Sequence, residues 1–243
     1  MVERLTAPAR AFATTSVAVV AFGVAMGFLE AAVVVYLRAA IGLGPPGLIP
    51  AHDPATFGTF EGVEVTRELA TLVMIAAVGW LAGPSPLERL AWASIAFGVW
   101  DIVYYAGLRA LIGWPPALDG WDVLFLVPVP WVAPVWAPIV VSTALIGVGL
   151  AAARRLRAGR GIRVGWIRAL IVLTGGALVV MSFVVDAGRV LGGDVGSWAA
   201  WPLFWAGMAL AAGGTLPALA NAPGRSQMGN SFRDEPDGRR LAG

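Results

Sequence analysis

The sequence has no cysteine, no lysine and a single histidine, His52. Without cysteine the chain can form no disulfide, no thiolate metal site and no iron–sulfur cluster. One histidine excludes bis-histidine haem ligation and any zinc site that needs two or three imidazoles. No cofactor is therefore evident from composition, although a hard cation held by carboxylate oxygens remains compatible with it.

Charge is also scarce. Charged residues make up 13% of the chain and hydrophobic residues 58%, with a mean hydropathy of +0.76. Soluble domains are usually about 25% charged, and several stretches here exceed the ~18 apolar residues that indicate a membrane helix. The composition predicts an all-α, polytopic transmembrane helix bundle in a single domain over residues 1–220. A polar tail, which we expect to be disordered, follows over residues 221–243.

Six spans are predicted, over residues 13–39, 64–82, 88–112, 134–153, 166–188 and 197–219. The loop before the fifth span is rich in arginine from Arg154 to Arg168 and has no acidic residue, so it should face the cytoplasm. Six spans then place both termini in the cytoplasm. We expect a multi-pass protein of a prokaryotic cytoplasmic (inner) membrane. Its partners would be the lipid bilayer and either further copies of itself or a membrane complex. The basic pI of 9.7 reflects these loop arginines, and no nucleic-acid partner is expected.

The segment from Trp121 to Pro138 is almost wholly apolar, yet it contains four prolines. Prolines at that density cannot lie in one regular helix, because each removes a backbone donor and clashes with the preceding turn. We therefore expect a short helix near 121–127, a proline break, and then the fourth span. Residues 121–134 would be either re-entrant or interfacial, in the second case anchored by tryptophans.

Acidic residues interrupt the spans. Glu30, Glu68, Asp101 and Asp186 lie within or at the edge of apolar stretches, where a charge costs at least ~2.5–3.5 kcal/mol. The predicted topology places nearly all of them in the outer half of the membrane. Such residues need either partners or a function.

Helical spacing indicates which way these acids face. Gly23, Gly27 and Glu30 share one helix face, and small residues on a face allow close helix packing. Asp101 follows Gly98 by three residues and therefore shares its face. Arg67 follows Glu64 by three residues and can pair with it.

The candidate binding residues are Glu30, Glu64, Arg67, Glu68, Asp101, Tyr104, Tyr105, Arg109 and Asp122. Candidate metal ligands are Glu30, Glu68, Asp101 and His52, and no catalytic residue is identified.

These residues favour an acidic pocket that binds or transports a small cation or a proton-coupled solute, because carboxylates suit protons and hard cations. One alternative is a non-catalytic structural or accessory subunit, in which the same residues form a buried ion-pair network. A second alternative is a membrane-embedded enzyme with a carboxylate-bound metal. The sequence contains no phosphate-binding loop, dinucleotide fingerprint, nucleophile elbow or zinc-protease motif.

Four strings together resemble a family of uncharacterised prokaryotic multi-span integral membrane proteins: GFLEAAVVVYLR, EVTRELATLVM, FGVWDIVYYAGL and WDVLFLVPVPWVAP. The likeness covers about residues 20–140. It implies a multi-span fold and carries no established activity. It gives weight to Glu30, Glu64, Arg67, Glu68, Asp101 and Asp122.

Overall fold

The computed structural model describes residues 7–40 and 54–220, with side chains placed over 10–40 and 62–220. Six of its helices are long and apolar enough to cross a membrane, which confirms the predicted transmembrane helix bundle. They are α1 (Ala7–Ala40), α2 (Pro54–Ala82), α3 (Pro86–Ile112), α4 (Trp136–Arg157), α5 (Trp166–Val184) and α7 (Trp201–Ala220). The chain also forms two strands, β1 (Trp121–Phe125) and β2 (Trp131–Pro134), and a short helix, α6 (Ala187–Leu191). His52 and the predicted tail 221–243 lie outside the described residues.

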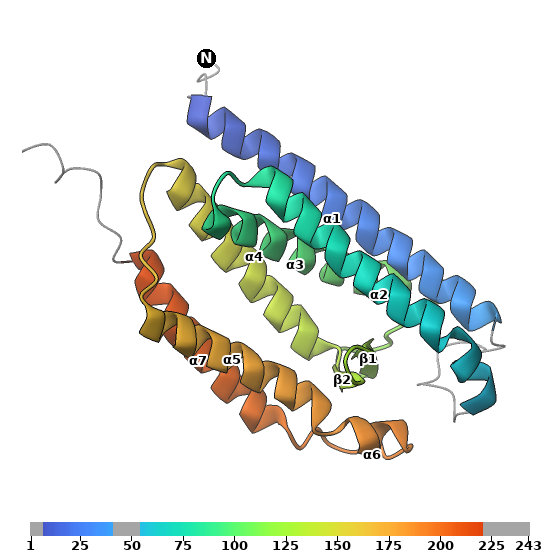
Figure 1. Cartoon of the computed structure of the whole chain (residues 1–243). Coiled ribbons are helices and arrows are strands. Elements are labelled where there is room, and N and C mark those ends of the chain that lie inside the picture. Colours follow the sequence, from blue (N-terminus) through green and yellow to red (C-terminus); the bar gives the residue numbers. More distant parts are fainter. Residues whose placement is uncertain (1–6, 41–53, 221–243) are drawn as a thin grey trace, which may run out of the picture.

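The helices form two groups (Figure 1). In the first group, α3 packs against α1, α2 and α4; in the second, α5 packs along α7. Figure 1 shows that α1 begins and α7 ends at the same end of the bundle as the α4–α5 connection. We call this the arginine end, because the connection and its flanks carry Arg154 to Arg168. The opposite end, toward which β1 and β2 lie, is the hairpin end.

Small residues allow α3 to approach two neighbours closely. A Cβ atom added to Gly27 of α1 would lie 2.5 Å from the Trp100 carbonyl oxygen of α3. A Cβ atom added to Gly98 of α3 would lie 2.5 Å from the Ser142 carbonyl oxygen of α4. Only glycine fits at such contacts. The same packed faces carry Glu30 and Asp101.

Residues 121–134 form a β-hairpin, so the short helix predicted near 121–127 is wrong. The strands pair antiparallel, with Trp121 opposite Pro134 and Val123 opposite Val132, and a bulge separates Val123 from Phe125. Valine and aromatic side chains favour strands, and the prolines between the strands and at the end of β2 prevent a regular helix there. Pairing satisfies the backbone groups with which the two strands face each other, which matters where water is excluded.

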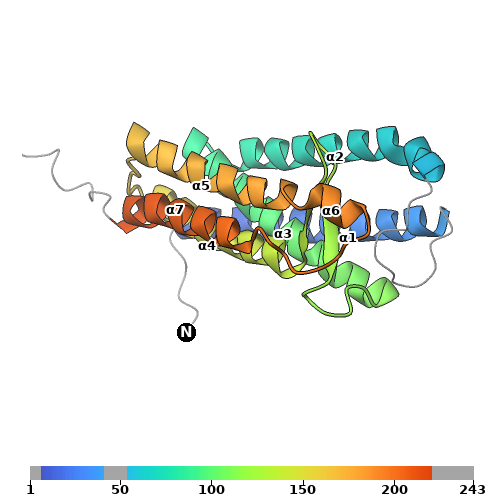
Figure 2. The ribbon, with the colours of Figure 1, turned by 90° about the horizontal axis from the view of Figure 1, so that it is seen from below.

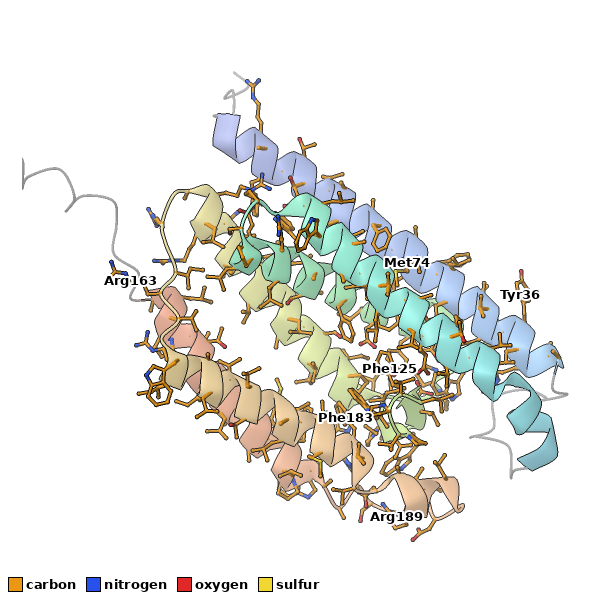
Figure 3. All side chains as sticks on the ribbon, viewed as in Figure 1. Tyr36, Met74, Phe125, Arg163, Phe183 and Arg189 are labelled. Carbon is orange, nitrogen blue, oxygen red and sulfur yellow. The ribbon has the colours of Figure 1, made fainter. Side chains whose placement is uncertain are left out.

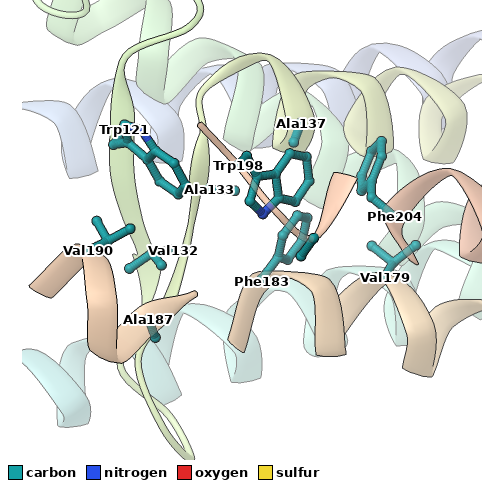
Figure 4. Packing of buried hydrophobic residues seen from close by; sticks show 11 residues of the cluster. Trp121, Val132, Ala133, Ala137, Val179, Phe183, Ala187, Val190, Trp198 and Phe204 are labelled. Carbon is teal, nitrogen blue, oxygen red and sulfur yellow. The ribbon is translucent and has the colours of Figure 1, made fainter. Parts of the chain in front are cut away.

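The hairpin lies between the two helix groups and runs across the helix axes (Figure 2). On one side, Val132 and Ala133 pack with Phe183, Trp198 and Phe204 in an apolar cluster with α5 to α7 (Figure 4). On the other side, the Phe125 ring lies 6.5 Å from Phe97 and 6.1 Å from Trp100. These two residues stand near the middle of α3, which favours a re-entrant hairpin over an interfacial one. The hairpin therefore joins the two groups and closes the region where most of the acidic residues gather.

Candidate functional site

Five acidic side chains gather where α1, α2, α3 and β1 meet, since electrostatic interactions link Glu30 with acids of α2 and α3, and Asp101 with Asp122. Figure 3 shows how the side chains crowd around Phe125 of β1. Glu30 comes from α1, Asp101 from α3 and Asp122 from β1, and the other two lie on α2. We call this set the carboxyl cluster: Glu30, Glu64, Glu68, Asp101 and Asp122. The polar contacts within it show how the sequence has placed each carboxyl group.

Arg67 joins two of the carboxylates. Its Nη1 lies 2.7 Å from Glu30 Oε1 on the neighbouring helix. Its Nε donates to Glu64 Oε2 at 3.0 Å, and its Nη2 donates to the other oxygen of Glu64. The spacing of three residues brings Glu64 and Arg67 onto one face of α2, as the sequence predicts. Glu30 also accepts a hydrogen bond of 3.0 Å from the indole Nε1 of Trp100. One guanidinium group thus serves two carboxylates.

Glu68 ties α2 to the hairpin. Its side chain is buried, and both of its oxygens accept from the backbone N–H of Leu126, at 3.0 and 2.9 Å. Leu126 directly follows β1, at the point where the strand ladder stops and its N–H needs another acceptor. A carboxylate that accepts from a backbone N–H forms a charge-assisted bond. Glu68 therefore fixes the position of the hairpin connection relative to α2.

Asp101 is buried between α3 and α4. Its Oδ2 accepts a hydrogen bond of 2.8 Å from the Ser142 hydroxyl of α4, which is completely buried. Its charge also interacts with that of Glu30 across the α1–α3 contact. The close approach at Gly98 brings the α4 hydroxyl within reach of this carboxyl group.

Asp122 and two tyrosines complete the cluster on the hairpin side. The Tyr105 hydroxyl donates to Asp122 Oδ2 at 3.0 Å, and the Tyr104 ring stands edge-on to Tyr105 at 5.0 Å. Burial raises the pKa of Asp122 to about 7, against the lowering effect of the Tyr105 hydroxyl and the Val123 backbone N–H. The negative charge of Asp101 raises this pKa further, and the positive charge of Arg38 opposes it.

The cluster contains more acid than base. Its five carboxyl groups interact with the guanidinium groups of Arg67 and Arg38, among the described residues. Two positive charges therefore stand against five acidic groups. A buried charge without a partner is strongly destabilising, and crowded like charges disfavour one another. The cluster therefore carries a formal excess of negative charge, which neutral donors such as the Ser142 hydroxyl and the Leu126 N–H partly stabilise.

One predicted site residue stands apart from the carboxyl cluster. Arg109 is exposed, and its Nη1 donates to the carbonyl oxygens of Gly113 at 2.7 Å and Pro115 at 3.0 Å. Arg109 therefore caps the C-terminal end of α3 and does not pair with the carboxyl cluster. His52, a candidate metal ligand, lies outside the described residues. Within the described residues no three acidic or imidazole groups are arranged so that they could hold a metal ion.

Several partners were missed by the sequence analysis. Trp100 was overlooked because adjacent helix residues do not share a face, and the Leu126 N–H depends on a hairpin that was not predicted. Ser142 offered a signal, since it is a hydroxyl seven residues before Gly149 on the packed face of α4.

A second buried ion pair was also missed. Glu88, in the first turn of α3, pairs with Arg157, in the last turn of α4, and Arg157 also donates to the Ala82 carbonyl oxygen at 2.8 Å. This pair lies at the arginine end, and it could have been anticipated because antiparallel neighbours bring the first turn of one helix beside the last turn of the next. It balances one acid with one base, unlike the carboxyl cluster.

No family model matches the chain, and no curated protein or solved structure matches it.

Proposed function

We propose that this protein binds protons at the carboxyl cluster and couples their binding to that of a small solute. The membrane is a prokaryotic cytoplasmic membrane, and the cluster stands in its outer half. This orientation follows from the arginines between Arg154 and Arg168, which favour the cytoplasmic side. Both termini then face the cytoplasm, because the number of membrane-spanning helices, six, is even.

The observation that carries the proposal is the excess of carboxyl groups over guanidinium groups in one buried place. A proton neutralises a single carboxyl group, so it suits neighbouring acids that come from four elements and do not converge on one point among the described residues. A hard cation needs about six oxygen ligands around one point, and the described acidic residues do not supply three such groups together. The geometry thus supports the proton among the cations that composition leaves open.

The bundle is closed toward the arginine end by apolar packing. Trp92, Ile95 and Ala96 of α3 are fully buried there, in a cluster that also takes side chains from α1, α2 and α4. This layer lies between the carboxyl cluster and the Glu88–Arg157 pair. Protons and solute therefore reach the cluster from the hairpin end, and transport across the membrane would need a rearrangement of the helices.

A structural or accessory subunit is the second candidate, and one observation favours it. Every carboxyl group of the cluster has a protein donor, from Arg67, Trp100, the Leu126 N–H, Ser142 or Tyr105. Such a network could serve only to fix the helices. The two candidates differ in whether the stability of the protein depends on proton binding.

Thermal unfolding in detergent between about pH 5 and pH 8 separates the candidates, with Asp101→Asn and Glu68→Gln compared to the wild type. If the cluster binds protons, the unfolding temperature of the wild type falls as pH rises, and the variants lose part of that dependence without a large loss of stability. If the network is structural, the variants are destabilised at every pH and the pH dependence stays the same. Glu88→Gln is the matched control, because it breaks a balanced pair and should destabilise without changing the pH dependence.

The same titration includes Na⁺, K⁺, Mg²⁺ and Ca²⁺. We expect no stabilisation of the wild type by any of them. A cation that raises the unfolding temperature of the wild type, but not that of Glu68→Gln, would show that the ligand is that cation and not the proton.

A further inference from the structure

The two halves of α2 are attached to the bundle in different ways. At the arginine end, Ile75, Val78 and Ala82 pack into the apolar cluster with α1, α3 and α4. Over residues 62–74, which we call the α2 arm, none of the described side chains belongs to an apolar core cluster. The arm buries only Glu68 and Thr71, whereas Leu69 and Val73 are 47% and 67% exposed. Apolar packing therefore fixes the half of α2 at the arginine end, whereas the α2 arm is not held by apolar packing.

Further contacts fix α2 at the arginine end. The Arg89 guanidinium of α3 lies 3.6 Å from the centre of the Trp80 ring and donates to the Gly83 carbonyl oxygen at 3.0 Å. Arg157 of α4 donates to the Ala82 carbonyl oxygen. This end of the helix thus has apolar, cation–π and hydrogen-bond contacts with two neighbours, which suits it to act as a pivot.

The arm is attached to its neighbours through two carboxylates, one on α1 and one on the arm itself. Arg67 of the arm pairs with Glu30 of α1, and Glu68 of the arm accepts from the Leu126 N–H of the hairpin. In Figure 2 the hairpin reaches across the bundle to α2 at this point. Both attachments need the carboxyl group to be ionised for full strength, because an ion pair and a charge-assisted bond each lose their charge on protonation.

We propose that the α2 arm is a gate over the carboxyl cluster, released when Glu30 and Glu68 bind protons. The inference rests on the proposed proton binding. The charged groups that face Glu68 are Glu64 and Arg67 on its own helix and Glu30 on α1. Those that face Glu30 are Glu64, Arg67 and Glu68 from α2, and Asp101 and Tyr104 from α3.

The arrangement of Arg67 explains how the arm can leave without a stranded charge. Arg67 is bonded through Nε and Nη2 to Glu64, which is also on the arm. When Glu30 takes up a proton, Arg67 therefore stays paired within its own helix, and Glu30 keeps the hydrogen bond from Trp100. Movement of the arm then uncovers Glu30, and beyond it Asp101, from the side of α2.

The absence of cysteine makes the gate directly measurable, because spin labels can be placed without removing native thiols. Leu69→Cys on the arm and Val24→Cys on α1 form the reporting pair, since both positions are exposed. Leu81→Cys and Val17→Cys, also exposed and on the same two helices, form the control pair at the pivot end. Distances are measured by double electron–electron resonance in lipid at about pH 8 and about pH 5, with and without Glu30→Gln plus Glu68→Gln.

We expect the reporting pair to gain a population longer by about 5 Å or more, the scale of one helical turn, at the lower pH. The neutral double variant should show that population at both pH values, and the control pair should not change. A longer distance in the double variant with no pH response in the wild type would show that neutral side chains release the arm, but it would overturn proton binding as the trigger and with it the proposed function. A short distance in the double variant at both pH values, or an equal change in the control pair, would overturn the gate.

Discussion

Arg67 is the residue on which the charge balance of the carboxyl cluster depends most. It is the one guanidinium group bonded to both Glu30 and Glu64 among the described residues. We expect Arg67→Gln to destabilise the protein by about 3–5 kcal/mol, because it leaves two partly buried carboxylates without their base. Unfolding in detergent at neutral pH measures this loss. Adding Glu30→Gln to the variant should restore part of the stability, and a double variant no more stable than Arg67→Gln would contradict the pairing.

Asp122 gives a pH prediction with a definite sign. Its pKa is 3.8 in an unfolded chain and about 7 in the folded protein, chiefly because the carboxyl group is buried. Between these values the native state holds a proton that the unfolded state has released, so the contribution of Asp122 to stability falls as pH rises from about 4 to about 7. Above that range the contribution is constant.

Asp122→Asn should therefore flatten the dependence of the unfolding temperature on pH over that window. The Tyr105 hydroxyl can still donate to the amide oxygen, so the fold should survive the change. Asp119→Asn, an exposed neighbour before β1, is the control and should leave the slope as it is in the wild type. An unchanged slope in Asp122→Asn would show that this carboxyl group is already ionised in the native state at low pH.

At the scale of elements, close helix contacts position the acids. Gly98→Ala puts a Cβ atom 2.5 Å from the Ser142 carbonyl oxygen, so α3 and α4 must separate. We expect a loss of about 1–3 kcal/mol from overpacking, with a weaker Ser142–Asp101 bond. Gly147→Ala on α4 is the matched control, since no atom lies within 4 Å of its added Cβ. Alanine favours helix, so this control should be neutral or stabilising. Equal effects of the two changes on the unfolding temperature would refute close contact at Gly98.

The long helices could be predicted from sequence because apolar runs of membrane length have few alternatives in lipid. The inward faces of Glu30 and Asp101 followed from the spacing of Gly27 and Gly98, since helix period fixes which residues share a face. The hairpin could not be predicted in this way. A short apolar run is compatible with either a strand or a helix. The prolines excluded a long helix, but they did not indicate which structure forms in its place.

The partners of the acids were less predictable than the acids themselves. Ser142 and the Leu126 N–H reach Asp101 and Glu68 only because α4 and the hairpin take a particular rotation and depth. Neither quantity is encoded in the spacing of one segment. Arg109 shows the converse, since it was predicted to belong to the binding site. It closes the end of its own helix instead.

The proposed binding of protons from the outer side requires one orientation of the whole molecule in the membrane. The arginine end should face the cytoplasm, because positive loops are retained there. Reporter fusions at Gly161, in the α4–α5 connection, and after Gly243 should both report a cytoplasmic position. A periplasmic signal at Gly161 would reverse every depth assigned here and place the carboxyl cluster in the inner half of the membrane.

The central claim is that the carboxyl cluster holds protons in the folded protein at neutral pH. Infrared spectroscopy measures this directly, through the C=O stretching band of protonated carboxyl groups, in lipid-reconstituted protein titrated across neutral pH. The account predicts a band in the wild type that shrinks as pH rises, is smaller in Glu68→Gln and Asp101→Asn, and is unchanged in Glu88→Gln. Absence of that band in the wild type at neutral pH, or equal loss in Glu88→Gln, would contradict it.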